Sequence, residues 1–152
     1  MTHKLVDVYP YIVSGRDAEH KVRFLILKRS MNVIYAKQWR MIGGKVHSGE
    51  HRAEAAVREL QEETGSRPEE IWTVPDINQF YDVKTDTINH IAVFAARLNS
   101  HGKVRLNHEH DCYKWISVEE VATFIRWPEQ VRLINLIHDI LTQKEILPEW
   151  RV

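Results

Sequence analysis

The residues best suited to chemistry lie between positions 44 and 66. In chain order they are Gly44, Glu50, Arg58, Glu59, Glu62, Glu63 and Gly65. On a helix, Glu59, Glu62 and Glu63 fall three and four residues apart, so their carboxylates project together and repel one another. A hard divalent cation such as Mg²⁺ or Mn²⁺ removes that repulsion. The spacing therefore predicts a metal site, with a simply solvated acidic face as the alternative.

These acidic positions require a helix over about residues 51–64. Apolar residues at three- and four-residue spacing predict one buried stripe, and they are Ala53, Ala56, Val57 and Leu60. Gly65 follows directly and suits a left-handed C-cap. Upstream, residues 41–49 hold three glycines, which let the backbone approach a ligand closely.

Two further charges are expected to support the acidic face. Glu50 falls near the helix start, where the helix dipole favours an anion. Arg58 is expected to reach back to Glu50, or along the helix to Glu54 and Glu62. Its role would be to orient carboxylates rather than to carry out chemistry.

Residues 44–66 resemble the Nudix box, G-x5-E-x7-R-E-U-x-E-E-x-G-U, in which U is a bulky apolar residue. Every specified position matches except the last, where Ser66 replaces an apolar residue. The resemblance implies a Nudix hydrolase, which is an α/β/α sandwich with a mixed β-sheet. Such an enzyme uses Mg²⁺ or Mn²⁺ to cleave nucleoside diphosphates linked to another group.

The resemblance also implies roles for single residues. Glu59, Glu62 and Glu63 would be metal ligands. Gly44 would add its carbonyl oxygen to the ligand set. Glu50 and Arg58 would form the supporting pair.

Residues outside the box narrow the substrate. Lys28 and Arg29 end a predicted strand and Trp39 precedes the glycine segment, so cations could meet phosphates and the indole could stack on a base. The alternative is a solvated strand end and a core tryptophan. Farther along, Glu109-His110 leads into Tyr113-Lys114-Trp115, followed by the capped helix and the Trp127-Pro128 helix start. With these motifs, most of residues 5–140 resembles the branch of the family that acts on dATP and dihydroneopterin triphosphate. In that branch a loop glutamate reaches the metal cluster, which implies Glu109 as a further ligand, with a solvated loop carboxylate as the alternative.

The mechanism expected from these charges is hydrolysis by a metal-activated water. Glu62 or Glu109 would accept the proton of that water as general base, and Glu63 would complete the catalytic carboxylates. The favoured reaction converts a nucleoside or pterin triphosphate to the monophosphate and pyrophosphate. Other Nudix substrates (a dinucleoside polyphosphate, a nucleotide sugar or an RNA 5′ end) and a non-catalytic nucleotide-sensing module are the alternatives. A zinc site at residues 108–112 is set aside, because the two histidines there have no second ligand pair.

Length, charge and composition restrict the remaining possibilities. The 152 residues suit a single domain over 1–152, and 21 basic residues balance 21 acidic ones, so neither nucleic acid nor a membrane is an expected partner. No apolar run approaches the roughly 20 residues that span a bilayer, and residues 1–13 do not resemble a signal peptide. Cys112 is the only cysteine, which suits the cytoplasm, and it is expected to be buried. The expected state is a monomer or homodimer that binds a small nucleotide.

Alternating patterns predict the elements around the site. Strands are expected over 6–13 and 22–27, joined by a turn at 14–17, and over 39–42, 71–74, 79–83, 88–98 and 111–116. Ser117 begins a capping box, which predicts a short helix. Pro128 suits the first turn of a final amphipathic helix. Mixed strands and helices of this kind favour an α/β sandwich.

Overall fold

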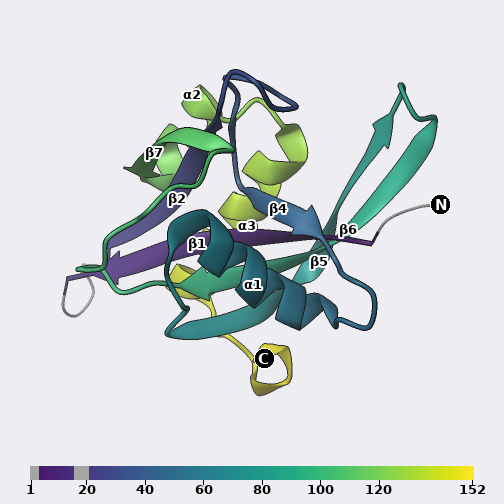
Figure 1. Cartoon of the computed structure of the whole chain (residues 1–152). Coiled ribbons are helices and arrows are strands. Elements are labelled where there is room, and N and C mark those ends of the chain that lie inside the picture. Colours follow the sequence, from purple (N-terminus) through teal and green to yellow (C-terminus); the bar gives the residue numbers. More distant parts are fainter. Residues whose placement is uncertain (1–3, 16–20) are drawn as a thin grey trace.

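One mixed sheet forms the centre of the molecule (Figure 1). The computed structural model describes residues 4–15 and 21–152, so Arg16 and Asp17 of the expected turn lie outside the described residues. The strands are β1 (Leu5–Ser14), β2 (Lys21–Arg29), β3 (Trp39–Arg40), β4 (Ile42–Lys45), β5 (Glu70–Asp82), β6 (Thr87–Arg97) and β7 (His110–Ile116). Their order is β3-β2-β1-β6-β5, with β4 also paired to β1 and β7 to β2. The β1–β6 pair is parallel, and the other pairs that these strands form among the described residues are antiparallel.

Helices cover both faces of this sheet (Figure 1). Helix α1 (Arg52–Thr64) packs on one face, and α2 (Val121–Phe124) and α3 (Pro128–Gln143) pack on the other. Successive side chains of a strand point to opposite faces. In β1, Val6 and Val8 therefore join the core under α1, whereas Tyr9 and Tyr11 join the core under α3. The predicted α/β/α sandwich with a mixed sheet is confirmed. Short 3-10 helices, η2 (Val118–Glu120) and η3 (Pro148–Trp150), follow β7 and α3. No helix among the described residues is long and apolar enough to cross a membrane.

Helix α1 has the predicted ends but a different buried face. Its C-cap, Gly65, has a left-handed φ of 74°, which glycine adopts without strain. Ala56 and Leu60 are buried as expected, whereas Ala53 and Val57 are only half-buried. The face turned to the sheet instead includes Ala55, Glu59 and Glu63. Glu59 and Glu63 thus share the face that packs against the sheet, whereas Glu62 is exposed.

Three local expectations differ from the structure. The segments expected at 71–74 and 79–83 form one strand, β5, with an irregular register between Thr73 and Ile77. The segment expected at 39–42 divides into β3 and β4, and β4 continues through the glycine pair to Lys45 because it pairs with β1. The prediction that Cys112 is buried is wrong. Cys112 lies in β7, whose only strand partner in the described chain is β2 and whose central residues are exposed.

Candidate active site

Gly44 and Glu59 come into close contact where β4 leads toward α1. A Cβ atom built on Gly44 would lie 2.1 Å from Cδ of Glu59, far inside van der Waals contact. Glu59 is only 8% exposed, so its carboxylate occupies the space that any side chain at position 44 would need. Gly44 is not among the residues with positive φ. The glycine is therefore required by space rather than by backbone conformation.

Arg58 holds the carboxylates around it in fixed positions. Its Nε and Nη2 donate to the two oxygens of Glu50 at 2.8 and 2.9 Å, which is a bidentate pair. Its Nη1 donates to Glu59 Oε1 at 2.9 Å and, more weakly, to Glu62 at 3.4 Å. Nη2 also donates to the carbonyl oxygen of Lys45 at 2.8 Å, which ties α1 to the end of β4. Of the partners expected for Arg58, Glu50 and Glu62 are found and Glu54 is not.

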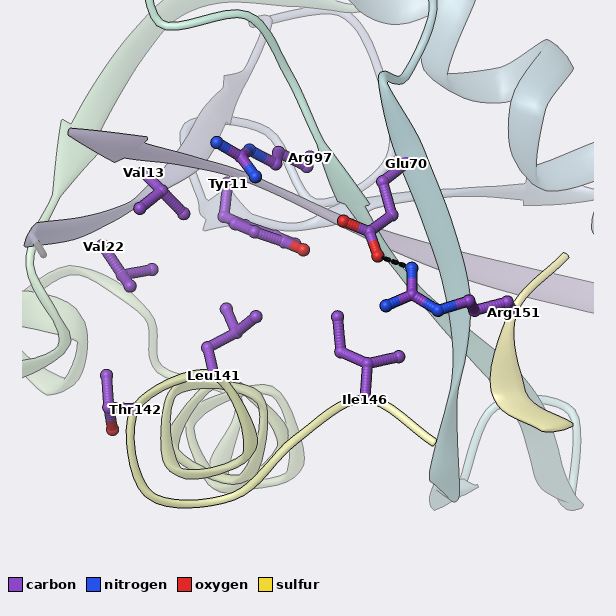
Figure 2. A pocket seen from close by; sticks show the side chains of 9 residues that line it. All are labelled: Tyr11, Val13, Val22, Glu70, Arg97, Leu141, Thr142, Ile146 and Arg151. Atoms are coloured by element: carbon purple, nitrogen blue, oxygen red, sulfur yellow. Dashed lines mark hydrogen bonds and ion pairs between the residues drawn. The ribbon is translucent and has the colours of Figure 1, made fainter. Parts of the chain in front are cut away.

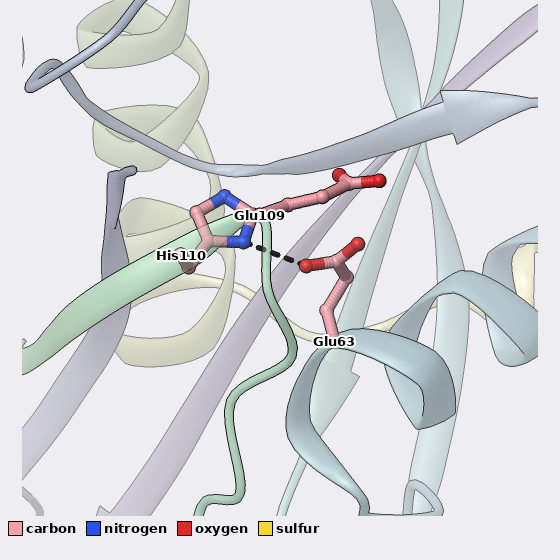
Figure 3. Close-up of side chains that lie close together, drawn as sticks. All are labelled: Glu63, Glu109 and His110. Atoms are coloured by element: carbon pink, nitrogen blue, oxygen red, sulfur yellow. Dashed lines mark hydrogen bonds and ion pairs between the residues drawn. The ribbon is translucent and has the colours of Figure 1, made fainter. Parts of the chain in front are cut away.

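A second group joins the end of α1 to the loop before β7 (Figure 3). Ligand atoms of Glu63, Glu109 and His110 all lie within 4.8 Å of one another. His110 Nδ1 lies 2.6 Å from Glu63 Oε2, and Arg29 Nη1 lies 3.4 Å from His110 Nε2. Because arginine only donates hydrogen bonds, Nε2 is the acceptor and the Nδ1 proton is donated to Glu63. Arg29 Nη1 also donates to Glu109 Oε2 at 3.3 Å.

Asn107 explains how the loop places Glu109 beside the helix. Its side-chain Nδ2 donates to the carbonyl oxygen of Glu62 at 3.3 Å, and its Oδ1 accepts from the backbone N–H of Glu109 at 2.9 Å. One side chain therefore satisfies an open carbonyl in the last turn of α1 and fixes the loop backbone.

The local environment gives these carboxyl groups different proton affinities. Burial raises the pKa of Glu59 to about 7, against the opposing effect of Arg58. Burial is the largest single effect on Glu63 and opposes its ionisation, but His110, Asn107 and the charge of Arg29 together outweigh burial, so the pKa of Glu63 falls below its ordinary value. The bidentate bond from Arg58 lowers the pKa of Glu50 to about 2.

A pocket of about 310 Å³ opens beside the Glu109–His110 pair. Gly43 and Gly44 form part of its wall, and its lining also includes Asp7, Tyr35, Arg40, Phe80 and Ile91. A larger cavity of about 450 Å³ lies between β1 and the C-terminal part of α3, where Glu70 and Arg151 form an ion pair (Figure 2). That cavity contains none of the residues between 44 and 66. Volume alone therefore does not select a site, and the acidic cluster, rather than the larger cavity, is the candidate active site.

The structure brings together some of the predicted site residues and separates others. Arg29 and Glu109 line the pocket, whereas Lys28 and Trp39 do not. The ring of Trp39 packs edge to face on Phe124, with centroids 5.9 Å apart, which favours the core alternative. Glu62 is exposed, with 52% of its side chain accessible, and lies outside the Glu63–Glu109–His110 group.

His110 and Asp7 are among the residues at the site that were not predicted. His110 was considered only as a zinc ligand, although its position next to Glu109 was the available signal. Asp7 was not singled out, although it is the one charged residue in the apolar segment 5–13. A lone carboxylate inside a buried strand is itself unusual and is a signal of function.

An acidic cluster beside a pocket, built on an α/β/α sandwich, is typical of metal-dependent hydrolases. Comparison with known proteins identifies the family. The NUDIX domain model matches residues 8–137. The chain is 29% identical over 126 residues to the asymmetrical bis(5'-nucleosyl)-tetraphosphatase of Caenorhabditis elegans, covering 82% of this chain and 88% of that protein. It is 30% identical over 98 residues to nucleoside triphosphatase NudI of Escherichia coli (strain SE11), covering 60% of this chain and 70% of that protein. The chain belongs to the Nudix hydrolase family.

Solved structures agree with this assignment at the level of fold. A C. elegans Ap4A hydrolase in a binary complex has a TM-score of 0.75 at 24% identity, covering 93% of this chain and 99% of that one. The E. coli dihydroneopterin triphosphate pyrophosphohydrolase has a TM-score of 0.67 at 20% identity, covering 88% and 95%. The family prediction is confirmed, and the branch that acts on dATP and dihydroneopterin triphosphate stays a prediction.

Proposed function

We propose that this chain hydrolyses a phosphoanhydride bond of a nucleoside polyphosphate in the presence of Mg²⁺ or Mn²⁺. The observation that carries the proposal is that the carboxylates of Glu63 and Glu109 lie close together beside the pocket. The carboxylate of Glu59 lies against Gly44, which belongs to the same pocket. Carboxylate oxygens and a carbonyl oxygen form a donor set that suits a hard divalent cation.

The residues present fit such a cation. Glu59, Glu63 and Glu109 would hold it, with the Gly44 carbonyl oxygen, and Glu62 would join on the exposed side. The fit is supported by Gly44, since any side chain there would displace Glu59. When bound, the cation would neutralise phosphate charge and lower the pKa of a water molecule.

The other side chains of the site orient these carboxylates. Arg58 fixes Glu59, and His110 fixes Glu63 through its Nδ1 proton. Arg29 holds one oxygen of Glu109. Of the two general-base candidates, Glu109 is favoured over Glu62, because Glu109 lines the pocket whereas Glu62 is exposed and bonded to Arg58.

Two substrate classes are supported by different relatives. The similarity to tetraphosphatases extends over 82% of this chain and favours a dinucleoside tetraphosphate, which asymmetric hydrolysis divides into a nucleoside triphosphate and a monophosphate. The similarity to NudI favours a nucleoside triphosphate, which yields a monophosphate and pyrophosphate. We place the dinucleoside tetraphosphate first, since that similarity covers more of the chain, and dATP-like or pterin triphosphates second.

The substrate question is decided by a product assay. Diadenosine tetraphosphate, dATP, ATP, GTP, dihydroneopterin triphosphate and ADP-ribose are each incubated with the chain and Mg²⁺, and products are separated by ion-exchange chromatography. We expect AMP and ATP from the tetraphosphate at the highest kcat/KM. A higher kcat/KM for a triphosphate, with release of pyrophosphate, would reverse our order. Turnover of none of these compounds would contradict the proposal.

A matched pair of variants tests the cation site. EDTA should abolish activity, and Mg²⁺ or Mn²⁺ should restore it. Glu63→Gln should lower kcat by at least ~10²-fold, comparable to loss of a key electrostatic group. Glu54→Gln removes the same charge from an exposed position of the same helix, where its carboxylate accepts a hydrogen bond from the backbone N–H of His51, and it should change kcat less than about twofold. Equal effects of the two substitutions would show that Glu63 is not part of the cation site.

A further inference from the structure

The pocket beside the acidic cluster contains a carboxylate that cation binding does not use. Asp7 on β1 lines the pocket and is 7% exposed. Its Oδ2 accepts a hydrogen bond from Asn78 Nδ2 at 2.7 Å and lies 3.5 Å from the Tyr9 hydroxyl. Its Oδ1 accepts no hydrogen bond from any residue that the structure describes. Among the described residues, the fully buried side-chain atom that has no partner is Arg40 Nε. Oδ1 of Asp7 is therefore not fully buried, and it has access to the pocket that Asp7 lines.

The chain leaves space beside that oxygen. Gly43 pairs with Asp7 in the β1–β4 register, and a Cβ atom built on it would lie 2.9 Å from Oδ1. Gly43 does not have a positive φ. Glycine at this position is therefore explained by the open approach to Oδ1, which any larger residue would cover.

Planar side chains belong to the lining of the pocket that contains Asp7. The Arg40 guanidinium lies 4.1 Å from the centre of the Tyr35 ring and 4.5 Å from that of the Trp127 ring. Phe80 packs edge to face on Trp127 at 5.4 Å. Arg40, Tyr35 and Phe80 all line the pocket, and planar side chains of this kind stack on heteroaromatic rings.

We propose that Asp7 selects the base of the substrate, by accepting a hydrogen bond at Oδ1 from an exocyclic amino group. The inference rests on the proposed nucleotide hydrolysis and adds the chemistry of the base. An amino group offers an N–H donor, whereas an oxo group at the same place turns its lone pairs toward the carboxylate. A hydrogen bond to a buried charged acceptor is worth about 10- to 100-fold in affinity. The chain should therefore prefer adenine nucleotides to the hypoxanthine nucleotides that carry oxygen in place of the amino group.

Asp7→Asn tests this with a predicted reversal. Asn78 donates to the oxygen on its side, so the new amide should turn its carbonyl oxygen to Asn78 and its NH2 group to the pocket. The acceptor becomes a donor. The ratio of kcat/KM for ATP to that for ITP, and for diadenosine to diinosine tetraphosphate, should be at least ~10 in the unchanged chain and below 1 in the variant.

Two further variants separate base selection from a structural role of the Asp7–Asn78 pair. Exchanging the partners, with Asp7→Asn and Asn78→Asp together, lets the carboxylate at 78 accept from the amide at 7. The amide oxygen then faces the pocket, and the preference for adenine should return. Tyr9→Phe removes the other contact of the same carboxylate outside the pocket and should leave the ratio unchanged.

Binding of AMP and IMP, measured by isothermal titration calorimetry with each variant, makes the outcome independent of turnover. Suppose that the chain hydrolyses nucleotides but Asp7→Asn lowers kcat/KM equally for the adenine and the hypoxanthine substrate. Base selection by Asp7 is then overturned and the proposed function stands. If no nucleotide is hydrolysed, yet AMP binds at least ~10-fold more tightly than IMP only while Asp7 is present, the proposed function fails and the base selection holds. Equal affinity of the unchanged chain for AMP and IMP overturns base selection by Asp7.

Discussion

Asp7 should make the stability of this protein depend on pH in an unusual direction. Burial raises its pKa from 3.8 to about 6, although the bond from Asn78 and the charge of Arg40 oppose the rise. The folded protein thus holds the proton more tightly than the unfolded chain. The resulting stabilisation is complete below about pH 4 and is lost as the pH rises through 6. One pKa unit corresponds to about 1.4 kcal/mol, so ionisation of Asp7 costs about 3 kcal/mol of folding free energy above pH 7.

Asp7→Asn removes that cost, because asparagine keeps the acceptor for Asn78 and cannot ionise. We expect the variant to have a higher free energy of unfolding than the unchanged chain at pH 8, by about 1–3 kcal/mol, and nearly the same value at about pH 3.5, below the unfolded-state pKa of 3.8. Urea unfolding followed by tryptophan fluorescence, in EDTA and at half-unit pH steps, measures the difference. Groups common to both proteins cancel in that comparison.

Asp76→Asn is the matched control, because the environment of Asp76 acts in the opposite sense. Its hydrogen bond from Arg132, at 2.6 Å, lowers its pKa. The stabilisation from Asp76 is therefore present above its ordinary pKa of 3.8 and is lost as the pH falls, so this variant should be the less stable one at pH 8. A difference between Asp7→Asn and the unchanged chain that is independent of pH, or a less stable Asp7→Asn at pH 8, would refute the reasoning.

Three other substitutions test the supports of the acidic cluster. Arg58→Ala should weaken Mg²⁺ activation and kcat together by about 10- to 100-fold, since Glu50 and Glu59 lose their common partner; loss of folding with normal activity in the folded fraction would assign Arg58 a structural role only. Glu109→Gln should lower kcat by at least ~10²-fold with KM nearly unchanged, and a mutant within a few-fold of the unchanged chain would remove Glu109 from catalysis. Gly44→Ala should displace Glu59 and raise the Mg²⁺ concentration for half-maximal activity at least ~10-fold, and an unchanged value would show that Glu59 is not needed for cation binding.

The part of the site that follows from local sequence was predictable. Helix α1 begins and ends within one residue of the predicted bounds, because its C-cap glycine and its apolar spacing act within single turns. The contact between Arg58 and Glu50 was also expected, since both belong to one motif. The buried face of α1 was predicted less well. Small alanines give a weak apolar signal, and burial of Glu59 and Glu63 depends on what the sheet places opposite them.

The rest of the site depends on pairings between distant parts of the chain. His110 meets Glu63 across 47 residues, and Asp7 meets Asn78 across 71. Such contacts follow from the parallel β1–β6 pairing and from the position of β7 beside β2, which no local periodicity specifies. Trp39 illustrates the same limit. The contact that favours its interpretation as a core residue is with Phe124, which belongs to a separate helix.

The distribution of charge inside the molecule connects its stability to its binding properties. Buried carboxylates are ordinarily paired, and Glu63 obeys this rule through His110. Asp7 and Glu59 are paired too, with Asn78 and Arg58, but burial still raises the pKa of each. Both adjoin a glycine of β4 that leaves their oxygens approachable. A protein selected only for stability would replace both with neutral residues. Their retention is accounted for if ligands complete them, a divalent cation at Glu59 and an amino group of the base at Asp7, so that the free energy lost on folding is regained on binding.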